Sequence, residues 1–239
     1  MAAGMRDVVT SFYCDVLRQQ VDAGAIALSD SILIVCGGPL DEAVMRQVGF
    51  TRFTVTGLDH AGARQDAENL TYDNGSFDIT IVHAGLHHCY SPHRALLEMY
   101  RVARKRVLAF EARDSLLMRT AVRLGLTLDY EIDSVVGNKG GVAETGIPNF
   151  VYRWTEREVE KIIASFDPTR PPKVEFFYDL RIPVQRFFRS GNRALAIAGS
   201  AIAPLSRAFA AVLPRQCNEF AFVISKGGTP HQWITGLKE

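Results

Sequence analysis

The chain has 239 residues, of which 47% are hydrophobic and 22% are charged, and its formal net charge is +1. These values are ordinary for a globular protein and accommodate one large α/β domain. The four cysteines are scattered without a Cys-x-x-Cys pair, so neither a zinc knuckle nor a disulfide framework is indicated. Because Arg6 and Asp7 precede any apolar stretch, the N-terminus is a poor signal peptide and a cytoplasmic protein is expected.

Helical and strand patterns alternate through the first half of the chain. Residues 5–23 carry apolar side chains near helical spacing, and residues 31–35 form a continuous apolar run of strand length. Pro39 opens a helix that Gly49 closes. The elements predicted next are strands at 52–58, 64–65 and 77–83, a helix at 91–104, a strand at 106–113 and a helix at 115–124.

The second half continues the alternation after a polar, glycine-rich stretch. Thr155 and Glu158 have the spacing of a capping box, and the residues after them carry apolar side chains on one helical face. Strands are predicted at residues 173–182 and 219–226. Strands that alternate with helices predict a doubly wound, mostly parallel sheet, here with seven strands.

The segment from residue 180 to 218 contains six arginines and no acidic residue. Such a segment suits an anionic substrate or membrane surface, and it equally suits arginines that pair with acids elsewhere in the fold. Its uncharged run, residues 194–206, is shorter than the roughly 20 residues that a bilayer span needs. We expect this run to pack against the sheet or a partner chain, with a wall for an apolar acceptor or an interfacial anchor as alternatives.

Residues 65–104 combine an acidic turn at Asp66 and Ala67, a buried strand, a His-rich loop and a capped amphipathic helix. This order resembles class I S-adenosylmethionine-dependent methyltransferases of the type 11 branch. The resemblance implies S-adenosylmethionine as cofactor and a last strand that inserts antiparallel. It also implies a single methyltransferase domain over residues 1–239, with an N-terminal helical cap at 1–29, an acceptor-side loop at 127–154 and a helical insertion at 187–215.

Cofactor contacts are expected beyond the carboxyl ends of the strands. Asp59 follows the second strand, where a carboxylate can accept hydrogen bonds from both ribose hydroxyls. The resemblance implies that Asp66 accepts from the adenine amine beside Ala67, and that His83 and Ala84 lie beside the sulfonium.

The loop after the first strand departs from the glycine pattern of the family. Ile34 occupies the acidic position, and of the usual glycines only Gly38 is in register. We interpret Asp41 as a replacement carboxylate or as an ordinary acid of a helix's first turn. The loop residues expected at the cofactor are Cys36, Gly37, Gly38 and Asp41.

Three histidines cluster at the end of the strand at 77–83. Because His83 ends the strand and His87 and His88 lie in a loop, the ligand spacing that a helix would give is not supplied, and no metal is expected. His83 is a candidate general base, since histidine titrates near neutrality. Members of the family often use this segment structurally, so a structural role is the alternative.

Residues 140–154 are dense in glycines and aromatic residues. Such a loop suits a lid that excludes water, and it also suits an ordered surface connection. The residues expected to contact the acceptor are His87, His88, Asn149, Tyr152, Arg153 and Arg186.

The predicted activity is direct SN2 transfer of a methyl group to a small-molecule acceptor, at a hydroxyl oxygen. The basic, apolar segment favours an acceptor that is partly hydrophobic or anionic; no nucleic-acid partner is expected, and a homodimer is left open. The atypical glycine loop suggests an alternative, a binding or regulatory protein without turnover. A nicotinamide-dependent oxidoreductase is disfavoured, because the sequence contains neither GxGxxG after the first strand nor Tyr-x-x-x-Lys.

Overall fold

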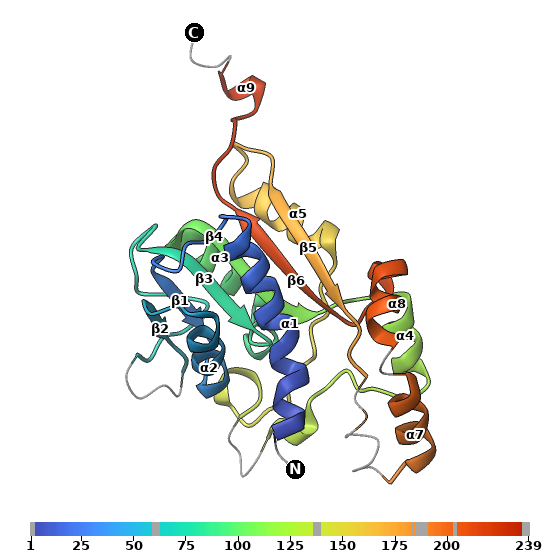
Figure 1. Cartoon of the computed structure of the whole chain (residues 1–239). Helices are drawn as coiled ribbons and strands as arrows, with labels where there is room; N and C mark the ends of the chain where they lie inside the picture. Colours follow the sequence, from blue (N-terminus) through green and yellow to red (C-terminus); the bar gives the residue numbers. More distant parts are fainter. Residues whose placement is uncertain are drawn as a thin grey trace.

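Figure 1 shows the computed structural model, which describes residues 3–58, 63–135, 140–182, 184, 191–202 and 205–235. In chain order the elements are α1 (Ala3–Asp22), β1 (Ile32–Val35), α2 (Pro39–Val48), β2 (Phe53–Val55), β3 (Phe77–His83), η1 (Leu86–His88), α3 (Pro92–Val102), β4 (Ala103–Ala112), α4 (Leu116–Arg123), η2 (Ile132–Ser134), η3 (Val142–Glu144), α5 (Glu156–Phe166), β5 (Lys173–Asp179), α7 (Arg193–Ile202), α8 (Ser206–Val212), η5 (Pro214–Gln216), β6 (Glu219–Ser225) and α9 (Gln232–Thr235).

The strands form one mixed sheet in the order β2-β1-β3-β4-β6-β5. β6 runs antiparallel to β4 and β5, whereas the pairs among β1 to β4 are parallel. The central register places Leu108 of β4 opposite Ile81 of β3 and Val223 of β6. The predicted doubly wound, mostly parallel sheet with an antiparallel last strand is confirmed, and the described residues contribute six strands to it in place of the seven expected.

The strand expected at residues 64–65 is a single parallel bridge between Gly57 and Arg64. After one backbone hydrogen bond, from Gln65 N–H to the Gly57 carbonyl at 3.2 Å, the chain leaves the sheet. The Gln65 side chain then bonds to Thr71, accepting from its amide at 3.0 Å and donating to its hydroxyl at 2.9 Å. These side-chain hydrogen bonds take the place of further backbone pairing between strands, so no edge strand forms at residues 64–65.

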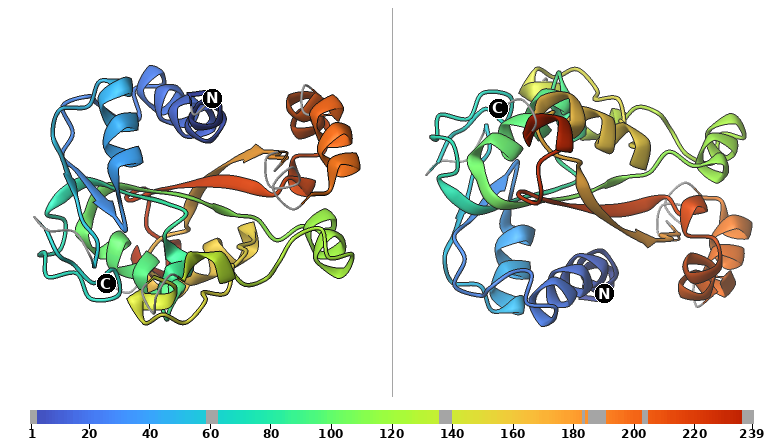
Figure 2. Two further views of the ribbon diagram at one scale, coloured as in Figure 1. Left: turned by 90° about the horizontal axis from the view of Figure 1, so that it is seen from below. Right: turned by 90° about the horizontal axis from the view of Figure 1, so that it is seen from above.

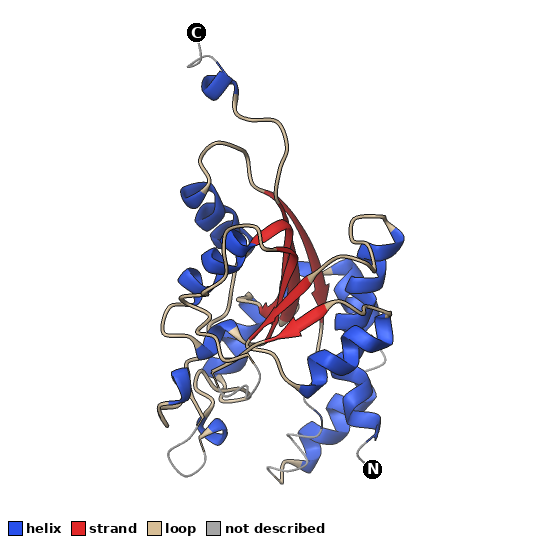
Figure 3. Cartoon of the chain, turned by 90° about the vertical axis from the view of Figure 1, so that its left-hand side faces the viewer, coloured by secondary structure: helices blue, strands red, loops and turns tan. Residues whose placement is uncertain are grey.

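Helices cover both faces of the sheet, α1 and α2 on one and α3 and α5 on the other, as Figures 2 and 3 show. Because successive side chains of a strand point to opposite faces, each strand feeds both cores. In β1, Leu33 packs with the α3 and α5 layer, and Ile34 packs with the α1 and α2 layer. The fully apolar pattern of β1 therefore reflects burial on both sides, as the sequence predicted.

The predicted helix starts around the site are confirmed at their caps. In α5 the Thr155 hydroxyl accepts from the Glu158 amide, and the Glu158 carboxylate accepts from the Thr155 amide, which completes the capping box. α2 has Pro39 in its first turn, and Gly49 ends it at a φ of 109°, which favours glycine. These caps fix where the loops next to the carboxyl ends of the strands begin and end.

α7 and α8 lie between β5 and β6 in the chain, and Figure 2 shows this helical pair apart from α4. Ala196 is fully buried, as expected of packing, but Ile197 is 65% exposed and Leu205 62%. Arg181 pairs with Glu219 at 3.1 Å. In the described residues no single helix has the length and apolarity of a membrane span, but the pair Arg193–Ala201 and Ser206–Val212, bent by 68°, passes by length and composition.

Candidate functional site

A cavity of about 430 Å³ opens at the carboxyl ends of β1 and β3. This is a size that binds small ligands, and the edge is where doubly wound sheets bind them. The loop after β1, the acidic turn, η1 and the loop at η3 all contribute to its wall. The lining residues are Cys36, Gly37, Gly38, Pro39, Gly57, Leu58, Gln65, Asp66, Ala67, Glu68, Ala84, Gly85, His88, Cys89, Gly141, Ala143 and Glu144.

Two glycines make the floor of this cavity possible. A Cβ at Gly37 would lie 2.6 Å from Cγ2 of Ile34 and 2.8 Å from Cγ1 of Val55. A Cβ at Gly85 would lie 2.6 Å from the Cβ of Cys36. Because both approaches are too close for any side chain, these two positions of the cavity lining require glycine to pack against the neighbouring side chains.

Two residues without glycine's freedom also adopt left-handed backbone conformations beside the cavity. Cys36, directly after β1, has a φ of 53°, and Ala84, directly after β3, has a φ of 49°. Such conformations are strained in residues with a Cβ and gather at ligand sites. The ends of both strands are thus shaped for the cavity between them.

Asp41 lies behind the glycine loop and is 6% exposed. Its Oδ2 accepts from the Gly38 amide at 2.9 Å, which caps α2, while Oδ1 has no hydrogen-bond partner in the described part of the chain. Burial raises the pKa of Asp41 despite that amide. Asp41 does not line the cavity, so the structure shows it as the residue that positions Gly38.

Asp66 and Ala67 line the cavity on the side of the acidic turn. Oδ1 of Asp66 accepts from the Glu68 amide at 2.9 Å, which closes the turn. Oε1 of Glu68 accepts from the Ser91 amide at 3.1 Å and so ties the turn to the start of α3. Asp59, the expected ribose ligand, lies outside the described residues.

His83 is not among the residues that line the cavity. Its ring stacks on the ring of Tyr13 of α1, with centroids 4.9 Å apart and planes 9° apart, and lies 6.2 Å from the ring of Phe110. The N-terminal helix therefore covers this histidine. This packing against α1 is what a structural role for His83, the alternative to a general base, would require.

His87 lies between two carboxylates. Nδ1 is 3.3 Å from Oε2 of Glu111 at the end of β4, and Nε2 is 3.6 Å from Oε2 of Glu131. Burial alone would lower the pKa of His87, but these two glutamates raise it to about 10. His87 in turn lowers the pKa of Glu131 to about 2. The other oxygen of Glu111 accepts from the amides of Gly85 and Leu86, so this buried acid fixes the loop after β3.

His88 and Cys89 reach the cavity from the same loop. Burial and the neighbouring His87 lower the pKa of His88. Cys89 contacts Cys36 across the cavity wall, and this contact, followed by burial, raises the pKa of the Cys89 thiol. The loop after β1, η1 and the loop at η3 therefore meet at one point.

The three expected acceptor residues of the 140–154 loop do not line the cavity. Asn149 is buried and donates to Glu131 at 3.1 Å. Tyr152 bonds to His93 and Glu158. Arg153 pairs with Asp129 at 2.6 Å. Arg186, which was also expected to contact the acceptor, lies outside the described residues.

Sequence reasoning missed Glu111, Glu131 and Glu144 as parts of this region. Glu111 carried a signal, because an acid within the apolar strand at 106–113 stands at the carboxyl end where sites form. Glu131 and Glu144 carried none, since they lie in a polar stretch where acids are ordinary. Their roles depend on how residues 129–135 and 140–150 lie relative to η1.

The comparisons with known proteins agree with this geometry. Residues 43–110 match the family model described as methyltransferase domain, of type 11. This match covers the segment from α2 to β4, which includes the acidic turn, β3 and the His-rich loop. No sequence among curated proteins matches the chain significantly.

Solved structures show the same fold at low identity. The YcgJ protein from Bacillus subtilis is similar at 12% identity and a TM-score of 0.50, over 90% of this chain and 98% of that one. A 1,6-didemethyltoxoflavin-N1-methyltransferase from Burkholderia thailandensis, solved with 1,6-didemethyltoxoflavin and S-adenosylhomocysteine, is similar at 11% identity and a TM-score of 0.50, over 95% of this chain and 82% of that one. Together, the family match over residues 43–110, the sheet order and the cavity at the carboxyl ends of β1 and β3 show a methyltransferase-like segment within the fold of class I methyltransferases.

Proposed function

We propose that this protein methylates a hydroxyl oxygen of a small, partly apolar molecule. The observation that carries the proposal is the cavity itself, in which a glycine-floored loop, the turn at Asp66 and the strained ends of β1 and β3 face one another. When bound, S-adenosylmethionine supplies a methyl carbon on a positively charged sulfur, and the C–S electron pair returns to sulfur on transfer to the nucleophile.

The residues present fit this cofactor at the cavity's β1 and β3 end. Gly37 and Gly38 would hold the amino-acid part by their backbone, because both line this part of the cavity. Asp66 and Ala67 would hold the adenine on the opposite wall, and Leu58 supplies an apolar surface beside them. Asp59, expected at the ribose, remains a proposal from the sequence.

The acceptor would enter on the side of η1 and η3. His88, Gly141 and Glu144 line that part of the cavity, which supports residues 127–154 as the acceptor-side loop. Alignment of nucleophile and methyl carbon supplies most of the acceleration for such a transfer, so few catalytic groups are needed. Asn149 contributes by holding Glu131 and thereby the loop.

Exposed apolar side chains on α4, α7 and α8 support an acceptor with an apolar part. Leu116 is 65% exposed, and Ile197 and Leu205 are similarly open. We propose that residues 187–215 form an insertion that extends the acceptor side, and that residues 1–29 form a cap over His83. Exposed apolar side chains that stand singly are normal on a protein surface, so their support for an apolar acceptor comes from the helices of the proposed insertion, α7 and α8.

The experiment is to incubate the protein with S-adenosylmethionine and matched acceptors, and to measure S-adenosylhomocysteine release. The panel pairs aryl or alkyl alcohols with the amines and carboxylic acids of the same carbon skeleton. Release above background with the alcohols, and less with their amine counterparts, is the expected result. Release only with amines would contradict oxygen as the nucleophile, and tight S-adenosylhomocysteine binding without any release would favour the binding or regulatory alternative.

A further inference from the structure

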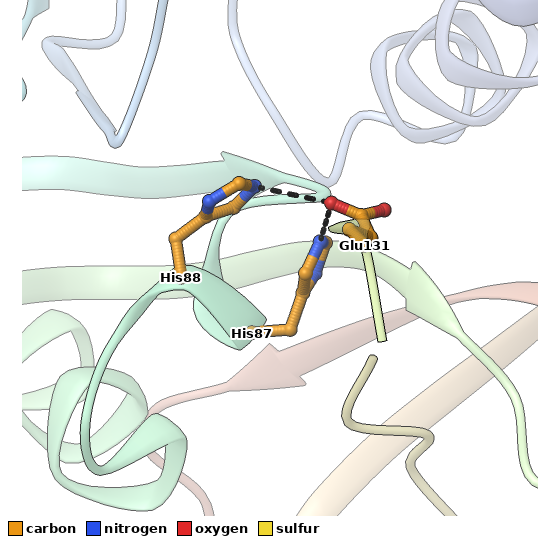
Figure 4. A group of neighbouring side chains, drawn as sticks. All are labelled: His87, His88 and Glu131. Carbon is orange, nitrogen blue, oxygen red and sulfur yellow. Dashed lines mark ion pairs between the residues drawn. The ribbon is translucent and has the colours of Figure 1, made fainter. Parts of the chain in front are cut away.

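Two histidines and one glutamate converge beside the cofactor cavity, as Figure 4 shows. His87 and His88 belong to η1, and Glu131 directly precedes η2. The Nε2 atoms of the two histidines lie 3.6 and 4.0 Å from the same oxygen, Oε2 of Glu131. One ligand atom from each residue lies within 4.8 Å of the other two. The three groups therefore point at a common centre.

The far side of the His87 imidazole is held by a carboxylate, since Nδ1 of His87 lies 3.3 Å from Oε2 of Glu111. Histidines that bind metals usually donate their second ring N–H to a carboxylate or a backbone carbonyl, which fixes the tautomer and aims the other nitrogen. His87 has that arrangement.

The carboxylate is held in the same way. Asn149 donates from Nδ2 to Oε2 of Glu131 at 3.1 Å, and Oδ1 of Asn149 accepts from the Ser134 hydroxyl at 3.1 Å. Asn149 is 1% exposed, so this support is rigid. Outer groups of this kind orient metal-binding carboxylates, and here they explain why an amide is buried at the base of the loop.

The distances from the two histidine Nε2 atoms to Oε2 of Glu131 also suit a shared metal ion better than direct hydrogen bonds. Two atoms that each lie ~2.1 Å from a tetrahedral ion are separated by roughly 3.4 Å, so the 3.6 and 4.0 Å separations need only small side-chain shifts to reach that geometry. Both separations are too long for good hydrogen bonds. A cation takes a lone pair from all three atoms at once, whereas a proton serves a single nitrogen and oxygen.

We propose that His87, His88 and Glu131 bind a divalent transition-metal ion, with Zn²⁺ as the reference, and that this ion accepts the hydroxyl oxygen of the acceptor as a further ligand. Two imidazoles and one carboxylate with an open position are a known donor set for catalytic zinc. The His87 side chain is 7% exposed, but those of His88 and Glu131 are 39% and 40% exposed, so the centre is open on one side.

The role of the ion in activating the acceptor hydroxyl rests on the proposed function. His88 and Gly141 line the cavity, so an ion held by His88 would face the acceptor side. A hydroxyl that binds the ion releases its proton to solvent more easily, because the positive charge stabilises the oxygen anion. The oxygen then attacks with its lone pair. No general base is needed for this step, which is consistent with the position of His83 outside the cavity.

The test is calorimetric titration of the chelator-treated, full-length protein with ZnCl₂, together with elemental analysis after dialysis. We expect one Zn²⁺ per chain. His88→Gln and Glu131→Gln should each weaken binding by at least roughly tenfold. His93→Gln is the matched control, because His93 pairs with Glu158 outside the cluster, and it should bind as the wild type does.

Three results would overturn the proposal. One is the absence of stoichiometric zinc; another is equal affinity in wild type, His88→Gln and Glu131→Gln. The third is loss of zinc in Cys36→Ser with retention in His88→Gln, which would place the ion on the thiols of Cys36 and Cys89. Thermal unfolding of each variant shows that it is folded, and His88→Gln is the preferred variant because His88 is partly exposed.

A separate titration with S-adenosylhomocysteine, with and without zinc, distinguishes this proposal from the methyltransferase assignment. We expect the nucleoside to bind in both conditions, because none of the three ligands is expected to hold it. Zinc binding without nucleoside binding would leave the metal site standing and remove the proposed function. Nucleoside binding without zinc binding would leave the proposed function standing and remove the metal site.

Discussion

Glu111 and His87 connect the end of β4 to the loop after β3. One oxygen of Glu111 lies 3.3 Å from Nδ1 of His87, and the other accepts from the amides of Gly85 and Leu86 at 3.0 and 2.9 Å. Glu111 is 3% exposed. A buried carboxylate with three partners is a stable arrangement only while all three remain, because an unpaired buried charge is costly. The geometry of the cavity's acceptor side depends on this residue.

Glu111→Gln should therefore destabilise the protein by about 1–3 kcal/mol, since one oxygen becomes an amide that cannot accept from His87. The free energy of unfolding in urea measures the effect. Glu160→Gln, at an exposed position of α5, is the matched control and should change the stability by less than about 0.5 kcal/mol. Equal stability of the two variants would show that Glu111 does not hold the loop.

Two glycines of the cavity wall should respond differently to alanine. At Gly85 the new Cβ would meet the Cβ of Cys36 at 2.6 Å and Cγ2 of Val82 at 2.9 Å, whereas at Gly38 no atom lies within 4 Å of it. Gly85→Ala should cost about 1–3 kcal/mol of stability through overpacking, and Gly38→Ala should leave the melting temperature nearly unchanged. The prediction fails if both variants melt alike.

Asp78 should make stability depend on pH at the acidic end. Burial would raise the pKa of Asp78, but hydrogen bonds from Ser31 and Arg104 outweigh burial and lower it. A carboxylate with a lowered folded-state pKa stabilises the fold above its unfolded pKa, about 3.9, and loses that contribution as pH falls through the folded value.

The matched comparison is Asp78→Asn. At pH 7 this variant should be less stable than wild type by about 1–3 kcal/mol, and the difference should shrink as the pH is lowered from about 4 towards 2. Urea unfolding at several pH values measures both. A difference that stays constant over this range would assign the loss to packing and not to the charge of Asp78.

The fold was largely predictable from the sequence, because its signals are local. The apolar run at residues 77–83 predicted both ends of β3, at Phe77 and His83. The spacing of Thr155 and Glu158 predicted the start of α5. Both-sided burial of β1 followed from its unbroken apolar run. The strand expected near Arg64 failed because the Gln65 side chain, whose partner is Thr71, competes with the sheet edge.

The site was predictable only where it follows directly from strand ends. Gly37, Gly38, Asp66 and Ala84 line the cavity, because they come just after strands or in the acidic turn. The partner of His87 could not be predicted, since Glu131 reaches it only through the fold of a long loop. Asn149, Tyr152 and Arg153 were expected in the cavity, but their side chains bond to Glu131, His93 and Asp129 respectively. These partners depend on the same long loop and could not be predicted either.

The most direct measurement of the central claim is calorimetric titration with S-adenosylhomocysteine of wild type, Asp66→Asn and Asp73→Asn. Asp66 lines the cavity, and Asp73 is an exposed acid outside its lining. We expect wild type and Asp73→Asn to bind alike, and Asp66→Asn to bind more weakly by about 1.5–3 kcal/mol, or roughly 10- to 150-fold, because a charged acceptor is lost. No binding by wild type, or equal binding by all three proteins, would contradict the assignment of this cavity to the cofactor.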